Sequence, residues 1–247
     1  MEQAERYRRR QDAERFIIAR ACARHLCANC IGLEPRLVPI LRTAFGKPYV
    51  EPTASYTLEF NVSDSGNSIL IAWSMSGPVG VDVEALHPGG RASFLEMAGS
   101  FLSVAETAVL RSAKDDEIAA IFTRIWARKE AILKGEVGAS GALRSLSVAD
   151  ENARGIRWFE NTVVPNSDRT WEMHELNLAP GYAACRRCLR LAALHTSSPI
   201  APRPKANSYP FEVPQSSVYD KCPRVSSTVG VVYHEMCPPR KRPTSPG

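Results

Sequence analysis

Residues 79–84 read Val-Gly-Val-Asp-Val-Glu, and this strict alternation constrains the fold more than any other feature of the sequence. Residues two apart in a β-strand share a face, so the three valines would point into a core while Asp82 and Glu84 project together on the other side. A strand that buries one face needs sheet partners and a second layer to pack against. The pattern therefore predicts a sheet that carries two neighbouring carboxylates.

Other periodic segments surround this strand. Helical spacing of apolar residues predicts helices over 2–29, 93–100, 103–112 and 115–134, and short β-branched or alternating runs predict strands over 58–62, 68–73, 156–159, 170–176 and 181–184. Ser103 and Glu106 form a capping-box pattern at the start of the third helix. Helices and antiparallel strands in this order predict the α+β class.

The last 52 residues differ in composition from the rest of the chain. Residues 196–247 hold ten of the 18 prolines, and seven Lys/Arg against three Asp/Glu, which supplies +4 of the net charge of +5. A proline- and serine-rich basic stretch of this kind predicts a disordered tail, although the apolar run 229–233 leaves a short strand or docking motif open. Because the charge belongs to the tail, the folded part is not expected to bind nucleic acid.

The sequence also predicts the compartment. The longest apolar run, Ile69 to Trp73, is far shorter than the roughly 18 residues that cross a bilayer. The first ten residues carry four arginines and no apolar run, unlike a secretory signal. We therefore expect a cytoplasmic protein without membrane association.

A second group of polar residues lies in the predicted helix 115–134. Trp126, Glu130 and Lys134 are four residues apart and share one helix face. In a purely structural interpretation, the tryptophan packs in the core, Glu130 and Lys134 form a surface salt bridge, and Asp82 and Glu84 lie on a solvated face. In a functional interpretation, Glu130 is a third carboxylate beside a cation, and the three acids bind a hard ion such as Mg²⁺.

The two groups together resemble the 4′-phosphopantetheinyl transferases of the type that activates peptide and polyketide synthetases. The resemblance covers roughly residues 5–193. It rests on G-V-D-V-E at 80–84, W-x-x-K-E-A-x-x-K at 126–134, the arginines Arg15, Arg20 and Arg24, G-K-P at 46–48, F-N-V-S-D-S at 60–65, F-L-S-x-x-E at 101–106 and P-G-Y-A-A at 180–184.

The resemblance implies a fold and a reaction. The fold would be two similar halves related by a pseudo-twofold axis, 1–78 and 79–195, with coenzyme A in the cleft between them. The reaction would be the Mg²⁺-dependent transfer of 4′-phosphopantetheine from coenzyme A to a serine of an apo acyl or peptidyl carrier protein. The enzyme would act as a monomer, and the sequence does not name the carrier.

The resemblance also implies roles for individual residues. Asp82, Glu84 and Glu130 would bind Mg²⁺, Glu130 would also take the serine proton, and Lys134 would offset charge on the leaving group. The expected coenzyme A contacts are Ser63 and Ser65 beside the 3′-phosphate, Gly46, Lys47 and Pro48 near the adenine, and the cations Arg20, Arg24 and Lys47 near the phosphates.

Two departures from the family pattern leave alternatives open. Asp64 replaces a histidine that helps to hold a phosphate in the family, so it would either repel the cofactor or turn away into solvent. Residues 135–138, Gly-Glu-Val-Gly, replace a more glycine-rich stretch. One alternative is a degenerate fold that binds coenzyme A without catalysis. Another is a metal-dependent phosphodiesterase or nuclease that uses the same acids.

Overall fold

A computed structural model describes residues 7–44, 46–135, 143–144, 146–148, 157–160, 170–189 and 229–235. Three antiparallel sheets and four α-helices make up these residues, which confirms the predicted α+β class. No helix in these ranges is both long and apolar enough to cross a membrane.

The chain begins with a long helix that covers one side of a small sheet. Helix α1 (Arg10–Ile31) buries Ala19, Ala23 and Leu26, and the 3-10 turn η2 (Pro35–Leu37) follows it. Strands β1 (Ile40–Arg42) and β2 (Pro48–Val50) then form a hairpin. Gly46 adopts a φ of 82° in the turn between them, a left-handed conformation that favours glycine.

The second sheet joins the first part of the chain to its end. Strands β3 (Glu59–Ser65), β4 (Ser68–Ser74) and β9 (Val229–Glu235) pair antiparallel in the order β3-β4-β9. Strand β9 lies inside the predicted disordered tail, so the alternative of a short strand in this stretch is confirmed. The rest of the tail lies outside the described residues.

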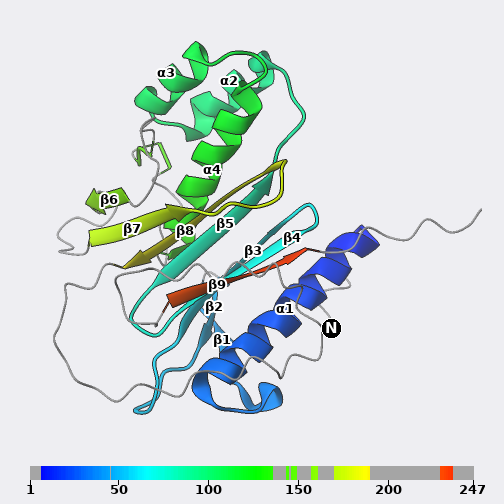
Figure 1. Cartoon of the computed structure of the whole chain (residues 1–247), viewed down its shortest axis with the longest axis vertical. Helices are drawn as coiled ribbons and strands as arrows, with labels where there is room; N and C mark the ends of the chain where they lie inside the picture. Colours follow the sequence, from blue (N-terminus) through cyan, green and yellow to red (C-terminus); the bar gives the residue numbers. More distant parts are fainter. Residues whose placement is uncertain are drawn as a thin grey trace, which may run out of the picture.

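The third sheet and three helices form the other end of the molecule. Its strand order is β5 (Val79–Ala85), β8 (Tyr182–Leu189), β7 (Thr170–Glu175) and β6 (Arg157–Glu160), all antiparallel. Helix α4 (Ile118–Gly135) runs along β5 and β8. Helices α2 (Arg91–Phe101) and α3 (Val104–Ser112) pack against the end of α4 that lies farther from α1 (Figure 1). The predicted capping box of Ser103 and Glu106 is present at the start of α3.

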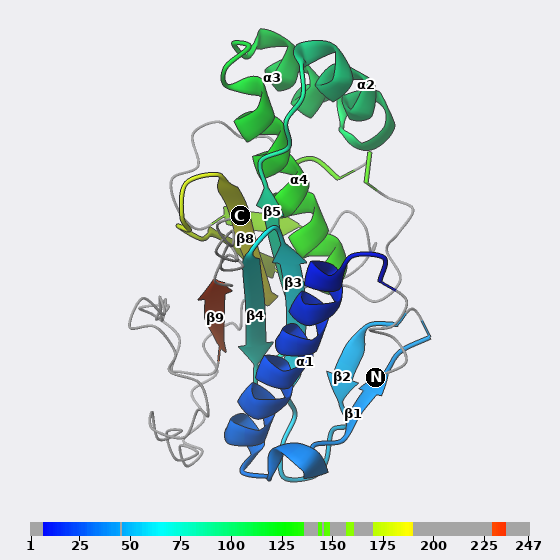
Figure 2. The same ribbon diagram turned by 90° about the vertical axis from the view of Figure 1, so that its right-hand side faces the viewer.

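Three apolar clusters hold these layers together. The first lies between α1 and the strands β2, β3 and β4, and Figure 2 shows α1 crossing β3 and β4. The second lies among α2, α3, α4 and the sheet that contains β5. The third joins the two larger sheets through side chains of β4, β5, β8 and β9, so the functional residues of β3 and β5 lie at a junction that is packed from both sides.

The structure departs from the predicted elements at the termini and in the shortest strands. Helix α1 ends two residues later than predicted, and β1 and β2 were not predicted as strands. Three residues are too few to show an alternating pattern, so their pairing depends on the turn that joins them. The expectation of two similar halves related by a pseudo-twofold axis stays a prediction.

Candidate active site

A glycine allows the helix and the strand of the predicted site to meet. A Cβ atom on Gly80 would collide with the carbonyl oxygen of Ala131 and lie 2.6 Å from the amide nitrogen of Gly135. Any side chain at position 80 would therefore push α4 away from β5. The close approach brings the face of α4 that carries Glu130 and Lys134 over the acidic face of β5.

The predicted orientation of the side chains of residues 79–84 is confirmed. Val79, Val81 and Val83 are fully buried in the cluster between the two larger sheets, and Asp82 and Glu84 project on the opposite side toward α4. The Asp82 side chain is only 1% exposed, so it does not lie on a solvated face. Burial raises the pKa of Asp82 to about 6, although the nearby Lys134 ammonium opposes the shift.

Lys134 makes its ion pair across the helix–strand interface. Its Nζ lies 2.5 Å from Asp82 Oδ1 and also donates a hydrogen bond of 3.1 Å to Ser63 Oγ. The lysine therefore supplies positive charge directly to the acid of β5. The expected structural role of Trp126 is confirmed, since its ring packs edge-on to Phe101 at 5.2 Å between ring centroids.

Glu130 lies beside this pair. Burial raises the pKa of its carboxyl, Lys134 opposes the shift and the charge of Glu84 adds to it. Glu130, Glu84, Asp82 and Lys134 are thus within electrostatic reach of one another.

The acidic side chains of this cluster bear on the expected metal ion in two ways. Within the described part of the chain, no three His, Cys, Asp or Glu side chains are grouped to hold a metal ion as they stand. However, Asp82 Oδ2 is buried and has no hydrogen-bond partner among the described residues. A buried carboxylate oxygen without a partner is costly unless a cation or proton binds it. This oxygen and the neighbouring carboxylates suit a hard divalent ion.

Ser63 and Ser65 lie on β3 and contact the acidic residues directly. Ser63 Oγ donates to Asp82 Oδ1 at 2.8 Å, and Ser65 Oγ donates to Glu84 Oε2 at 3.0 Å. The structure thus brings six of the predicted residues into one cluster at the β3–β5–α4 junction: Ser63, Ser65, Asp82, Glu84, Glu130 and Lys134.

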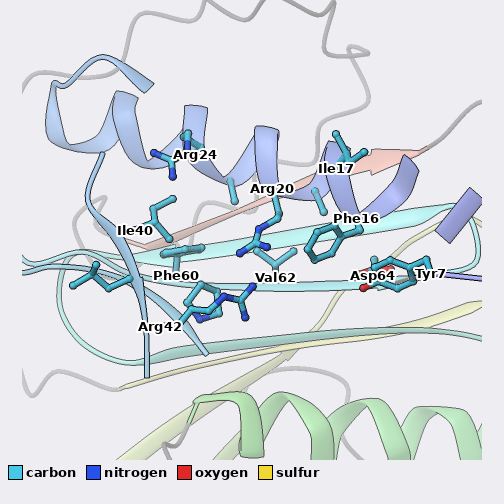
Figure 3. A pocket seen from close by; sticks show the side chains of 14 residues that line it. Tyr7, Phe16, Ile17, Arg20, Arg24, Ile40, Arg42, Phe60, Val62 and Asp64 are labelled. Carbon is cyan, nitrogen blue, oxygen red and sulfur yellow. The ribbon is translucent and has the colours of Figure 1, made fainter. Parts of the chain in front are cut away.

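Three of the remaining predicted residues line a neighbouring cavity of about 670 Å³ between α1 and the strands β1, β2 and β3. The other two, Gly46 and Lys47, lie in the turn between β1 and β2 and do not line it. Arg20, Arg24 and Pro48 line it, and Figure 3 shows Arg20 and Arg42 pointing toward its middle. Burial lowers the pKa of Arg20, and the positive charges of Arg42 and Arg24 lower it further. Arg24 also donates to the carbonyl oxygens of Pro35 and Val38. A cavity that gathers guanidinium groups suits an anionic ligand.

Asp64 lies at the edge of this cavity and has a cationic partner. Its Oδ2 accepts a hydrogen bond of 2.5 Å from Nε of Arg15, and the same guanidinium donates to Asp12 and to the Gly66 carbonyl oxygen. The carboxylate is therefore paired with a guanidinium group, although 36% of its side chain stays exposed to solvent.

Sequence reasoning missed several residues that organise the site. Lys129 is fully buried, and its Nζ lies 2.6 Å from Glu106 Oε2. This buried ion pair joins the motif at 101–106 to the motif at 126–134. The Tyr182 hydroxyl accepts a hydrogen bond from the Asn67 amide and holds the β3–β4 turn. The motif spacing could have suggested the first contact, but no local signal points to the second.

Two family models match the chain. The model described as the 4′-phosphopantetheinyl transferase superfamily matches residues 78–185, and the model described as 4′-phosphopantetheinyl transferase, N-terminal, matches residues 1–76. The second match adds the segment that contains α1, β3 and β4, so the two models account for both sides of the candidate site.

Individual relatives agree with these matches. A Synechocystis sp. protein named as a candidate 4′-phosphopantetheinyl transferase is 33% identical over 66% of this chain and 65% of its own length. A Bacillus subtilis 4′-phosphopantetheinyl transferase is 32% identical over 60% of this chain and 63% of its own length. The 4′-phosphopantetheinyl transferase AcpT of Escherichia coli K12 is 35% identical over 54% of this chain and 63% of its own.

The chain thus spans a little less than two thirds of the length of these curated relatives. Both family models nevertheless describe the same kind of protein, and their matches follow one another along the chain. On these matches, the chain belongs to the 4′-phosphopantetheinyl transferase superfamily.

Proposed function

We propose that this protein transfers the 4′-phosphopantetheine group from coenzyme A to a serine hydroxyl of an apo acyl or peptidyl carrier protein, with Mg²⁺ as the cofactor. The observation that carries the proposal is the buried carboxylate of Asp82, which has one oxygen bound by Lys134 and the other without a partner among the described residues. Phosphoryl transfer depends mainly on positioning and charge stabilisation, and this cluster supplies both.

In this proposal, Asp82, Glu84 and Glu130 hold the magnesium ion, which would offset the negative charge of the coenzyme A pyrophosphate. Lys134 adds a second positive charge beside Asp82, and this charge would stabilise the leaving phosphate. Three carboxylates and a pyrophosphate carry more negative charge than one divalent ion balances, so a nearby ammonium is required.

Glu130 is the proposed proton acceptor. Burial raises the pKa of its carboxyl, which makes the carboxylate a stronger base than that of an exposed glutamate. The serine oxygen forms a bond to the phosphorus that carries the pantetheine arm, and the serine proton moves to Glu130. The bond from this phosphorus to the bridging oxygen breaks, and adenosine 3′,5′-bisphosphate leaves with that oxygen.

The arginine-lined cavity is the proposed site for the nucleotide end of coenzyme A. Arg20 and Arg42 would face its phosphate groups, Pro48 would lie by the adenine, and Arg24 would support the site from α1. Lys47 precedes Pro48 in the turn between β1 and β2 and would approach the adenine from there. The ion pair between Asp64 and Arg15 removes most of the repulsion that a free carboxylate would cause at this edge.

The experiment is intact-mass spectrometry of several apo carrier proteins after incubation with the full chain, coenzyme A and Mg²⁺. We expect the added mass of phosphopantetheine, and we expect Glu130→Gln and Asp82→Ala to abolish it. Glu96→Gln, on the exposed side of α2, is a matched control that should keep the wild-type rate.

If no carrier gains mass while a known transferase modifies the same carriers, the proposed reaction is wrong. Binding of coenzyme A without turnover in this test would instead support a non-catalytic binding protein. We also propose that the enzyme works as a monomer in the cytoplasm, and light scattering of the purified protein tests the first of these points.

A further inference from the structure

Strands β3 and β5 lie side by side but belong to different sheets. Alternate side chains of β3, those of Asn61, Ser63 and Ser65, accept hydrogen bonds from backbone amides of β5. The distances are 3.0 Å from Val81 to Asn61, 3.2 Å from Val83 to Ser63 and 3.0 Å from Ala85 to Ser65. These three side chains, here called the side-chain ladder, take the place of a backbone partner at this edge of β5.

Two members of the side-chain ladder also bind the acids of β5. A hydroxyl group has one hydrogen to donate and two lone pairs that accept. Because the backbone amide must be the donor in its bond to the serine oxygen, each serine hydrogen is left for a carboxylate. Ser63 gives its hydrogen to Asp82 and Ser65 gives its hydrogen to Glu84.

Ser63 has all of its hydrogen-bonding capacity in use. Its oxygen accepts from the Val83 amide and from Lys134 Nζ, and its hydrogen goes to Asp82. Each serine therefore links one carboxylate of β5 to the backbone amide of the next residue: Ser63 links Asp82 to Val83, and Ser65 links Glu84 to Ala85. A carboxylate that is held in this way has already lost rotational freedom. Binding of a cation to it therefore costs less conformational entropy.

We propose that Ser63 and Ser65 are positioning residues, which orient Asp82 and Glu84 as ligands for Mg²⁺ through the side-chain ladder. The inference rests on the proposed function and deepens it. It differs from the expectation that the same hydroxyls contact the 3′-phosphate of coenzyme A, since hydrogens that point at carboxylates are not available to an anion.

The test compares Mn²⁺ binding by the full chain in the wild type, Ser65→Ala and Ser65→Thr, measured by electron paramagnetic resonance with and without coenzyme A. We expect Ser65→Ala to weaken Mn²⁺ binding about tenfold or more, as loss of a group that orients a metal ligand does. Ser65→Thr keeps the hydroxyl and should bind within about threefold of the wild type.

Ser74→Ala is the matched control. Ser74 is buried on the neighbouring strand, and its hydroxyl bonds to Ser76 rather than to an acid of β5. A purely structural role for Ser65 predicts that Ser65→Ala and Ser74→Ala lower the free energy of unfolding alike and leave Mn²⁺ affinity unchanged, and that result would overturn the positioning role alone. A wild-type chain that takes up no Mn²⁺ in either condition would overturn the proposed metal site and the positioning role with it.

Discussion

Lys129 and Glu130 are neighbours on α4, yet the structure gives them different environments. Lys129 is fully buried, and its Nζ lies 2.6 Å from Glu106 and donates to the carbonyl oxygens of Leu143 and Leu146. Glu130 is half-buried and lies beside the acids of β5. Successive residues of a helix point about 100° apart, so one motif supplies both a buried ion pair that stabilises the fold and a residue of the candidate site.

The buried pair of Lys129 and Glu106 makes a prediction about stability. Lys129→Met leaves the Glu106 carboxylate buried without its cation, so we expect the free energy of unfolding to fall by about 3–5 kcal/mol in urea denaturation. The double variant Lys129→Met/Glu106→Gln should recover part of this loss because no charge then remains. Glu14→Gln, which breaks an exposed pair with Arg10, should change stability by less than about 0.5 kcal/mol. Equal effects at the buried and exposed pairs would contradict the prediction.

The raised pKa of Asp82 makes a prediction about pH. The carboxyl ionises at about pH 6 in the folded chain and near its ordinary value of 3.8 when unfolded. Between these two pH values the carboxyl is already ionised in the unfolded state but still protonated in the folded state. The free energy of unfolding therefore falls as the pH rises. Asp82→Asn stays neutral, so its stability advantage over the wild type should grow between pH 4 and pH 7 by up to about 3 kcal/mol. Chemical denaturation of both proteins without metal, at several pH values, measures this difference, and a constant difference would contradict it.

At the scale of whole elements, the site depends on how closely α4 crosses β5. The crossing point is Gly80, where the backbone of α4 occupies the space that a side chain would need. The valines of β5 fix the other face of the strand in the core, so β5 cannot shift to make room. The separation of α4 from β5 therefore sets the separation of Lys134 and Glu130 from the acids.

Gly80→Ala tests this dependence. The added methyl group would force α4 outward, and we expect a loss of stability of about 1–3 kcal/mol with a loss of carrier modification that is larger than the stability change explains. Gly99→Ala is the matched control. A Cβ atom at position 99 meets no atom within 4 Å, and the substitution replaces a glycine inside helix α2. The control should be neutral or more stable by up to about 1 kcal/mol. Urea denaturation and the intact-mass assay measure the two effects. Full activity of Gly80→Ala would show that the crossing is not tight.

At the scale of the whole molecule, β4 is the strand that joins the layers. Ile69 and Ile71 pack toward α1, whereas Leu70 and Ala72 belong to the cluster shared with β5 and β8. On its outer edge β4 pairs along its full length with β9, and Val231 of β9 is buried in the same shared cluster. A segment from the end of the chain thus completes a sheet made near its beginning.

Truncation tests this contribution. A chain that ends at residue 228 lacks β9, so β4 loses its backbone partners on one edge and the burial of Val231. We expect its free energy of unfolding to fall by at least about 2 kcal/mol, with more aggregation through the open edge. A chain that ends at residue 236 keeps β9 and should behave like the full protein. Urea denaturation and light scattering measure both effects, and two truncations of equal stability would contradict the role of β9.

Much of this arrangement could be predicted from local patterns. The alternation of 79–84 was enough to place Asp82 and Glu84 on one face, and helical spacing placed Glu130 and Lys134 on another. The hydrogen bonds of Ser63 and Ser65 to those acids, the ion pair of Lys134 with Asp82 and the partner of Asp64 all join segments that are distant in sequence. Such contacts depend on how elements pack, which no local periodicity encodes.

The pairing of β4 with β9 has a consequence for biosynthesis. More than 150 residues separate Ser74 from Val229, so β4 leaves the ribosome long before its neighbour is made. At a translation rate of roughly 5–20 residues per second, the delay is roughly 8–30 s. Throughout this time one side of β4 is open to other nascent chains. Until β9 has been made, the growing polypeptide therefore presents an unpaired strand edge that favours association with other chains.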